Sequence, residues 1–253
     1  MPCKKNHIAL CVNIDHVATL RQARGEESPS VLDAARVVES VNADGVTVHL
    51  REDRRHIQDH DVYAVCSQCS LPLNLEMSLD PEIVRIACDV NPEQVTIVPE
   101  KRKELTTEGG LNVMREMNKI TRAVKRLQSR GIRVSLFVNA SLRQIDMCAK
   151  AGVEAVELHT GEYARCFSKG RYSQELTKLH KAAERAHQHG LRVHAGHGLN
   201  YENVGTLCAL PHLRELNIGH AIISHAVFTG LSEAITRMRS VMNGRGLYAK
   251  KEY

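Results

Sequence analysis

Short runs rich in β-branched residues alternate with longer stretches of helical periodicity eight times along this chain of 253 residues. This alternation is typical of repeated βα units and a parallel sheet, because each parallel strand needs a crossover segment before the next one. The expected strands are 8–13, 45–49, 73–76, 94–98, 133–138, 155–159, 192–195 and 215–218. The expected helices are 31–41, 81–90, 113–130, 142–151, 173–189, 203–210 and 231–242.

The number of units predicts a closed barrel. Gly131, Gly152 and Gly190 each stand between a helical stretch and a strand, where a glycine commonly ends a helix. A doubly wound open sheet is the competing architecture, but the G-x-G-x-x-G motif after its first strand is missing. We therefore expect an α/β fold, a single-domain (β/α)8 TIM barrel over residues 1–253, with a peripheral C-terminal tail from about residue 244.

The composition excludes several classes of protein. The first residues lack the apolar core of a signal peptide, and no apolar run is long enough to span a membrane, so we expect a cytoplasmic protein without membrane contact. The eight scattered cysteines fit reduced thiols, and the Cys66–Cys69 pair lacks the second ligand pair of a zinc site. A net charge of +5 with no Trp and three Phe argues against nucleic acid as a partner and fits small anionic substrates.

The longest polar connection follows the fourth strand, at residues 99–112. Its charges exclude it from the core. Two interpretations remain open, a lid over the barrel mouth and an ordinary solvated loop.

Polar residues stand at the ends of most expected strands, where barrel enzymes carry their chemistry. These residues are Asn13, Asp15 and His16; His49 and Arg51; Glu76; Glu157, His159 and Thr160; His197 and Gly198; and Asn217, Gly219 and His220. A single histidine at a strand end is more often structural than catalytic, but six such ends together favour one shared cavity. Histidines and carboxylates in such a cavity are suited to moving protons near neutral pH.

Two segments are candidates for binding phosphate. Glycines after the seventh and eighth strands allow backbone N–H groups and a helix N-terminus to approach an anion. The segment 49–56 concentrates arginines, of which Arg51 is the candidate ligand, while Arg54 and Arg55 are expected to form ion pairs with Glu52 and Asp53.

Three classes of function fit these residues. One is a metal-free lyase, synthase or isomerase acting on phosphorylated substrates, the second is a metal-dependent barrel hydrolase, and the third is an anion-binding protein without catalysis. No H-x-H motif occurs, which disfavours the hydrolase. A Schiff-base aldolase would need a buried lysine at a strand end, and the nearest candidates, Lys101 and Lys103, lie in the charged loop.

Long motifs in a fixed order resemble those of the pyridoxine 5'-phosphate synthase family over about residues 8–243. The motifs are VNIDHVATLRQARG (12–25), GVTVHLREDRRHI (45–57), NLEM (74–77), VPEKR (98–102), TTEGGL (106–111), ELHTG (157–161), AGHGL (195–199) and ELNIGHAI (215–222). The resemblance implies a condensation of 1-deoxy-D-xylulose 5-phosphate with 3-amino-2-oxopropyl phosphate to pyridoxine 5'-phosphate, phosphate and water. It further implies a reaction without metal or organic cofactor, a closing loop after the fourth strand and a homo-octamer.

The resemblance also implies roles for individual residues. His49 and Glu76 correspond to proton acceptors, His197 to the proton donor, and Glu157 to a group that stabilises the transition state. The residues that correspond to the amino-ketone phosphate site are Asn13, Arg24, Gly198, Gly219 and His220. Those that correspond to the deoxyxylulose phosphate site are Asp15, His16, Arg51, His56 and Thr106.

Some positions depart from the family pattern. His194 stands where the family usually has Asn, and Asn139 and Ser141 replace acidic residues. None of them is a residue to which the resemblance assigns a role. His194 precedes the expected proton-donor loop, so it bears on the hydrogen bonding around His197 more than on the reaction.

Overall fold

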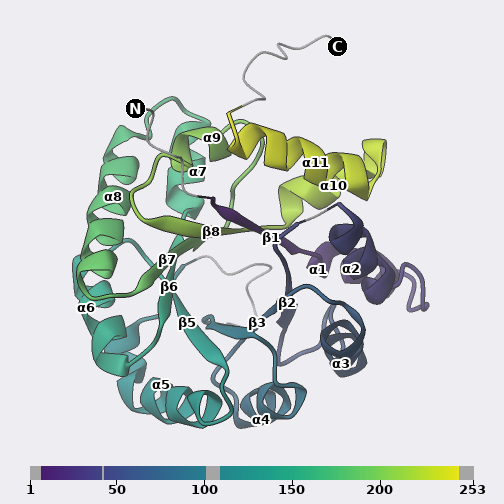
Figure 1. Ribbon diagram of the computed structural model, residues 1–253, viewed down its shortest axis with the longest axis horizontal. Helices are drawn as coiled ribbons and strands as arrows, with labels where there is room; N and C mark the ends of the chain where they lie inside the picture. The colour runs from purple at the N-terminus through teal and green to yellow at the C-terminus, as the bar shows by residue number, and fades with distance from the viewer. Residues whose placement is uncertain (1–6, 42, 101–108, 245–253) are drawn as a thin grey trace.

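The computed structural model describes residues 7–41, 43–100 and 109–244. Within them, eight parallel strands close into a barrel in sequence order, and β1 pairs with β8 (Figure 1). The strands are β1 (Ala9–Asn13), β2 (Gly45–Leu50), β3 (Leu73–Met77), β4 (Gln94–Ile97), β5 (Arg133–Val138), β6 (Ala155–His159), β7 (Arg192–Gly196) and β8 (Leu213–Ile218). The predicted (β/α)8 barrel is therefore confirmed, and the ends of each expected strand lie within two residues of the ends of an observed strand.

Helices surround the barrel on its outside (Figure 1). They are α1 (Asp15–Gln22), α2 (Val31–Ser40), α3 (Asp59–Gln68), α4 (Pro81–Val90), α5 (Val113–Gln128), α6 (Leu142–Ala151), α7 (Gly161–Phe167), α8 (Ser173–Gln188), α9 (Val204–Leu207), α10 (His220–Thr229) and α11 (Leu231–Met242). None of the helices described here is both long and apolar enough to cross a membrane.

Local sequence explains several helix boundaries. Ser30 accepts a hydrogen bond from the backbone of Asp33 at the start of α2, and Asp80 accepts bonds at the start of α4, where Pro81 occupies the first turn. At the other end of α6, Gly152 takes the left-handed conformation (φ 77°) that the sequence led us to expect.

Four of the observed helices are not predicted by the sequence pattern, namely α1, α3, α7 and α10. Helix α3 buries only Asp61, Val62 and Val65, so its apolar face is too narrow to produce a clear helical period. The other three begin next to the polar strand ends β1, β6 and β8, where polar residues suggested loops. The expected helix 203–210 is reduced to the single turn of α9.

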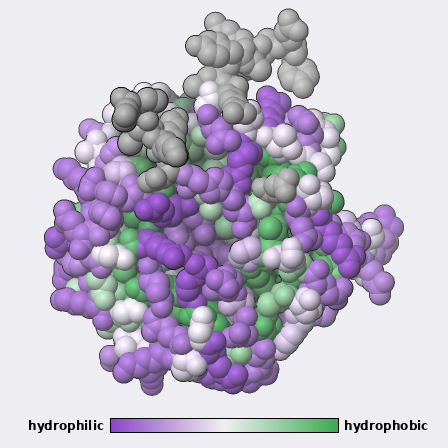
Figure 2. Space-filling view, in the orientation of Figure 1, coloured by the Kyte–Doolittle hydropathy of each residue, from purple (hydrophilic) through white to green (hydrophobic). Residues whose placement is uncertain are grey.

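The two faces of the barrel strands differ sharply in polarity. In β2, Val46, Val48 and Leu50 alternate with Thr47 and His49, and β3 repeats the pattern. Alternate residues of a strand point to opposite faces, so the aliphatic set packs outward against the helices and the polar set points into the barrel. Figure 2 shows the result as a hydrophilic centre within a band of more apolar residues.

The predicted C-terminal tail, about residues 244–253, and most of the predicted lid lie outside the described residues, which include only Gly244 of the tail and Pro99, Glu100 and 109–112 of the lid.

Candidate active site

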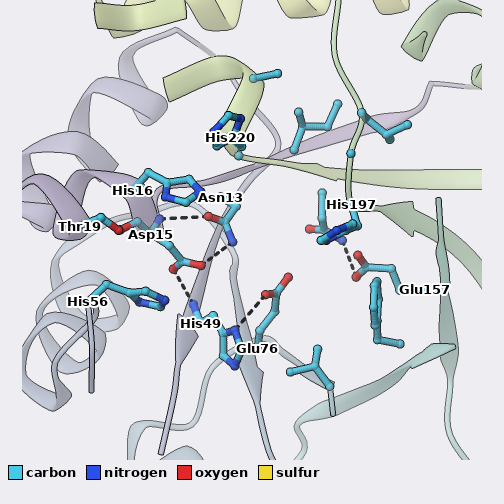
Figure 3. Close-up of a pocket in the computed structure, with 18 of the residues that line it drawn as sticks. Asn13, Asp15, His16, Thr19, His49, His56, Glu76, Glu157, His197 and His220 are labelled. Carbon is cyan, nitrogen blue, oxygen red and sulfur yellow. Dashed lines mark hydrogen bonds and ion pairs between the residues drawn. The ribbon is translucent and has the colours of Figure 1, made fainter. Parts of the chain in front are cut away.

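A cavity of about 700 Å³ lies at the carboxyl ends of the barrel strands (Figure 3). All predicted site residues except Arg24 and Thr106 line it. They are His49, Glu76, Glu157 and His197 of the catalytic set, together with Asn13, Asp15, His16, Arg51, His56, Gly198, Gly219 and His220. The polar strand ends therefore meet in one place, as the barrel prediction required.

The two exceptions differ. Thr106 lies outside the described residues. Arg24 is described, but its side chain is 77% exposed and its Nε pairs with Glu26 at 3.2 Å, away from the cavity lining. Its predicted contact with phosphate therefore stays a prediction.

His49 lies between two carboxylates. Its Nε2 is 2.9 Å from Oε1 of Glu100, and its Nδ1 is 3.8 Å from Oε2 of Glu76. Glu100 is held in turn by the backbone N–H of Glu52, which donates to its Oε2 at 3.1 Å. The role of Glu100 could not be read from the sequence, because its partner lies 51 residues away and nothing local indicates the contact.

The surroundings of this histidine raise two pKa values, its own and that of Glu76. Burial opposes protonation of His49, but the hydrogen bond with Glu100 and the charges of Glu76 and Asp15 outweigh it and raise the pKa. Burial raises the pKa of Glu76 to about 7, although the charge of His49 opposes the rise. Glu76 is thus able to exchange a proton near neutral pH, directly beside the His49 ring.

Asp15 joins the ends of β1 and β2. One carboxylate oxygen accepts a hydrogen bond from the backbone N–H of His49 at 2.7 Å, and the other accepts from Nδ2 of Asn13 at 2.8 Å (Figure 3). Asp15 is also the first residue of α1, where a negative charge is stabilised by the helix dipole. The carboxylate therefore fixes the backbone that carries His49.

Glu157 approaches the cavity from the opposite side of the barrel (Figure 3). It is 2% exposed, and burial together with the charges of Glu76 and Glu215 raises its pKa well above the usual range. A hydrogen bond from Nδ2 of Asn217 to its Oε2, at 2.9 Å, favours the ionised form.

His197 stands in a strained turn just after β7. Its φ is 78°, in the left-handed region that non-glycine residues rarely adopt, and Gly198 follows with φ 76°. The buried hydroxyl of Thr160 lies within hydrogen-bond distance of the carbonyls of Gly196 and His197, at 2.7 and 2.6 Å, and so stabilises the turn by donating to one of them. The ring of His159 lies against that of His197. Burial is the main cause that lowers the pKa of His159 to about 4, and the charge of His197 adds to it.

Two parts of the lining are suited to anions. On one side, Gly198, Gly219 and the first residues of α10 form a concave surface at a helix N-terminus. On the other, Arg51 is 3% exposed and lines the cavity with His56.

The two arginines assigned to solvent-exposed ion pairs behave differently from each other. Arg55 pairs with Asp53 at 2.6 Å as expected, but it also lines the cavity. Arg54 pairs with Asp59 and Glu82 instead of Glu52 and Asp53, because its side chain points toward the starts of α3 and α4.

Asp15, His49 and Glu76 also satisfy a geometric condition for a cation site, since their ligand atoms lie within 4.8 Å of one another. Much of this donor set is already engaged within the protein, by the backbone of His49, by Asn13 and by Glu100. The three residues therefore fit the hydrogen-bonded acid/base arrangement better than a set of ligands awaiting a metal.

Comparison with known proteins decides the family. The family model described as pyridoxal phosphate biosynthesis protein PdxJ matches residues 10–244. The chain belongs to this family. Among its relatives, the pyridoxine 5'-phosphate synthase of Photobacterium profundum is 52% identical over 237 residues, covering 94% of this chain and 98% of the relative. The enzyme of the same name from Magnetococcus marinus is 50% identical, covering 93% of this chain and 97% of the relative.

Solved structures agree on the fold of this family member. Phosphoribosylanthranilate isomerase from Thermotoga maritima, in a monomeric form, superposes with a TM-score of 0.59 at 12% identity, covering 94% of this chain and 100% of that one. KGPDC from Streptococcus mutans gives a TM-score of 0.62 at 13% identity, with coverage of 94% and 98%. These likenesses support the barrel architecture alone. The metal-dependent hydrolase finds no support among the relatives.

Proposed function

We propose that this chain is a pyridoxine 5'-phosphate synthase, which condenses 1-deoxy-D-xylulose 5-phosphate with 3-amino-2-oxopropyl phosphate to pyridoxine 5'-phosphate, phosphate and water. One observation carries the proposal: in a member of this family, the predicted proton-transfer groups His49, Glu76, Glu157 and His197 line a single cavity. Such a ring-forming condensation moves protons at several carbons in turn, so several acid/base groups must surround one pair of substrates.

The environments of these groups suggest their roles. Glu76, with a pKa of about 7, accepts a proton from a substrate carbon or nitrogen and returns it to a leaving oxygen. His49 acts beside it as the second acceptor, and Glu100 holds its ring in place. His197 donates a proton from the opposite side of the cavity, and the carboxylate of Glu157 stabilises positive charge that develops on an imine.

The two phosphates are assigned to the two anion-suited parts of the lining. Gly198, Gly219 and His220 are the proposed ligands of the amino-ketone phosphate, with Asn13 beside them. Arg51, His56, His16 and Asp15 are the proposed contacts of deoxyxylulose phosphate, since a buried Arg presents the planar fork that a phosphate prefers. Arg24 and Thr106 remain proposed ligands on the resemblance alone. The proposed reaction needs no metal or organic cofactor.

We further propose that the enzyme is a cytoplasmic homo-octamer. Self-association is supported by exposed apolar side chains on α10, where Phe228 is 88% and Val227 68% exposed. None of the seven described cysteines forms a disulfide, which fits a reducing compartment. Sedimentation equilibrium of the purified protein tests the octamer: a mass well below eight times the 28.2 kDa of the chain would contradict it.

His49→Asn tests whether the protein catalyses or merely binds anions. We expect turnover to fall by about 100-fold or more, while binding of each phosphorylated ketone, measured by calorimetry, changes by less than about tenfold. His60→Asn is the control, because His60 is an exposed histidine on α3 that does not line the cavity. A protein that only binds anions would show no turnover in the wild type and weaker binding in the variant.

A further inference from the structure

Polar side chains fill the barrel beneath the cavity. (β/α)8 barrels usually fill this space with branched aliphatic residues. Here the buried interior positions include Thr47 and Asn74, Gln94 and Thr96, and Asn217. Hydrogen bonds join them across the barrel, and Gln94 is linked to Asn217 through Glu215. A connected set of buried polar groups fixes the positions of its members, because each unmade hydrogen bond would be costly.

Asn217 lies where this set meets the floor of the cavity. Its Oδ1 accepts hydrogen bonds from Thr47 Oγ1 at 2.8 Å and from Asn74 Nδ2 at 3.3 Å. Its Nδ2 donates to Oε2 of Glu157 at 2.9 Å and to Oε1 of Glu215 at 3.3 Å. The amide nitrogen of Asn74 therefore faces the oxygen of the Asn217 amide, and two carboxylates face its nitrogen, so a flipped amide would face like groups at both ends.

The carboxylate of Glu157 depends on this amide for its position. Gly196 is the neighbour of Asn217 across the β7–β8 pair. It leaves room for the Glu157 carboxylate, since a Cβ at Gly196 would collide with Oε1 of Glu157. The carboxylate thus lies over a glycine, and Asn217 holds its other oxygen.

Several titratable groups surround Glu157. They are Glu76 from β3, Glu215 from β8, Cys11 from β1, His194 from β7, and His159 and His197 at the ends of β6 and β7. Glu215 itself accepts a hydrogen bond from Gln94 at 3.3 Å and lies 3.3 Å from Nδ1 of His194. Asn217 is thus a neutral donor between two carboxylates, Glu157 above it and Glu215 below.

We propose that Asn217 is a positioning residue, which holds the Glu157 carboxylate toward the substrates and favours its ionised form, and that the polar interior of the barrel fixes the orientation of its amide. The proposal rests on the proposed function, because it concerns the same site. It assigns Asn217 no contact with substrate. The residue acts through Glu157.

Asn217→Leu tests the proposal with little change in size and no added charge. The aliphatic side chain has no N–H to donate to Glu157, and a hydrogen bond to a charged group is worth about 10- to 100-fold in an equilibrium. We expect kcat to fall by about that factor while KM changes by less than about threefold. Loss of the donor raises the pKa of Glu157, so the acid limb of the kcat profile should move to higher pH.

Two further variants separate positioning from a merely structural role. Thr47→Val removes one donor that orients Asn217 but keeps the amide, and we expect a smaller loss of kcat with the acid limb moved in the same direction. It serves as the test if Asn217→Leu fails to fold. Ser135→Ala is the control, because the buried Ser135 hydroxyl makes no hydrogen bond among the described residues, and its kcat profile should match the wild type.

The possible outcomes are distinct. If the folded Asn217 and Thr47 variants had the same pH profile of kcat as the wild type, the inference would be overturned. It would also be overturned if their activity fell only in proportion to their thermal stability, with the acid limb at its wild-type pH. Wild-type protein that makes no product from the two phosphorylated ketones would instead contradict the proposed function.

Discussion

Replacing Glu76 by Gln should make the protein more stable at alkaline pH while removing most of its activity. The folded carboxyl has a pKa raised by burial to about 7, against 4.5 for the same group in an unfolded chain. It therefore binds its proton more tightly when folded, and its contribution to stability falls as pH rises from about 4.5 to about 7. The shift corresponds to about 3 kcal/mol of unfolding free energy above pH 7.

Glutamine has nearly the same shape but carries no charge. At pH 8 we expect Glu76→Gln to unfold roughly 6 to 12 °C above the wild type, and at pH 4.5 to unfold within about 2 °C of it. Turnover should fall by roughly 100-fold or more at every pH, with substrate binding retained.

Thermal unfolding followed by circular dichroism, at both pH values, measures the first effect, and steady-state kinetics the second. Glu27→Gln, at an exposed position, is the control and should change neither. Equal melting shifts at the two pH values would refute the argument from burial, and wild-type turnover would remove Glu76 from the mechanism.

Two further predictions concern groups around the cavity. In Glu100→Gln the pKa of His49 should fall, because the hydrogen bond and the charge that raise it are weakened, so the acid limb of the rate profile should move to lower pH. The control Glu52→Gln should leave the acid limb in place. Equal profiles in the two variants would show that Glu100 does not set the pKa of His49. In Asp61→Asn the buried guanidinium of Arg21 loses a carboxylate that accepts two hydrogen bonds of 2.7 Å. The free energy of unfolding, measured in guanidinium chloride, should therefore fall by about 3–5 kcal/mol. A loss below about 1 kcal/mol would contradict this prediction.

The strands could be predicted well because their outward faces are aliphatic and β-branched. In β3, Leu73, Leu75 and Met77 are buried against helices, and this regular burial gives the sequence its signal. Helix α3 could not be found the same way, because one of its few buried residues is the charged Asp61, which is held by Arg21 from a helix 40 positions earlier. Tertiary contact, rather than local periodicity, explains why that segment is buried.

The candidate site could be predicted as far as strand ends determine it. Parallel strands in one barrel bring their carboxyl ends together, so His49, Glu76 and Glu157 converge whatever the loops do. The hydrogen-bond partners that position these residues could not be predicted from the sequence in the same way. Glu100 and Asn217 lie 51 and 60 positions from the residues they hold, and only the folded chain places them there.

The most direct test of the central claim is an end-point assay of chelator-treated protein with both phosphorylated ketones, following pyridoxine 5'-phosphate and inorganic phosphate together. We predict that both products appear in the presence of the chelator. Product that appears only after a metal is restored would contradict metal-free acid/base catalysis, and no product in either case would contradict the proposed reaction itself.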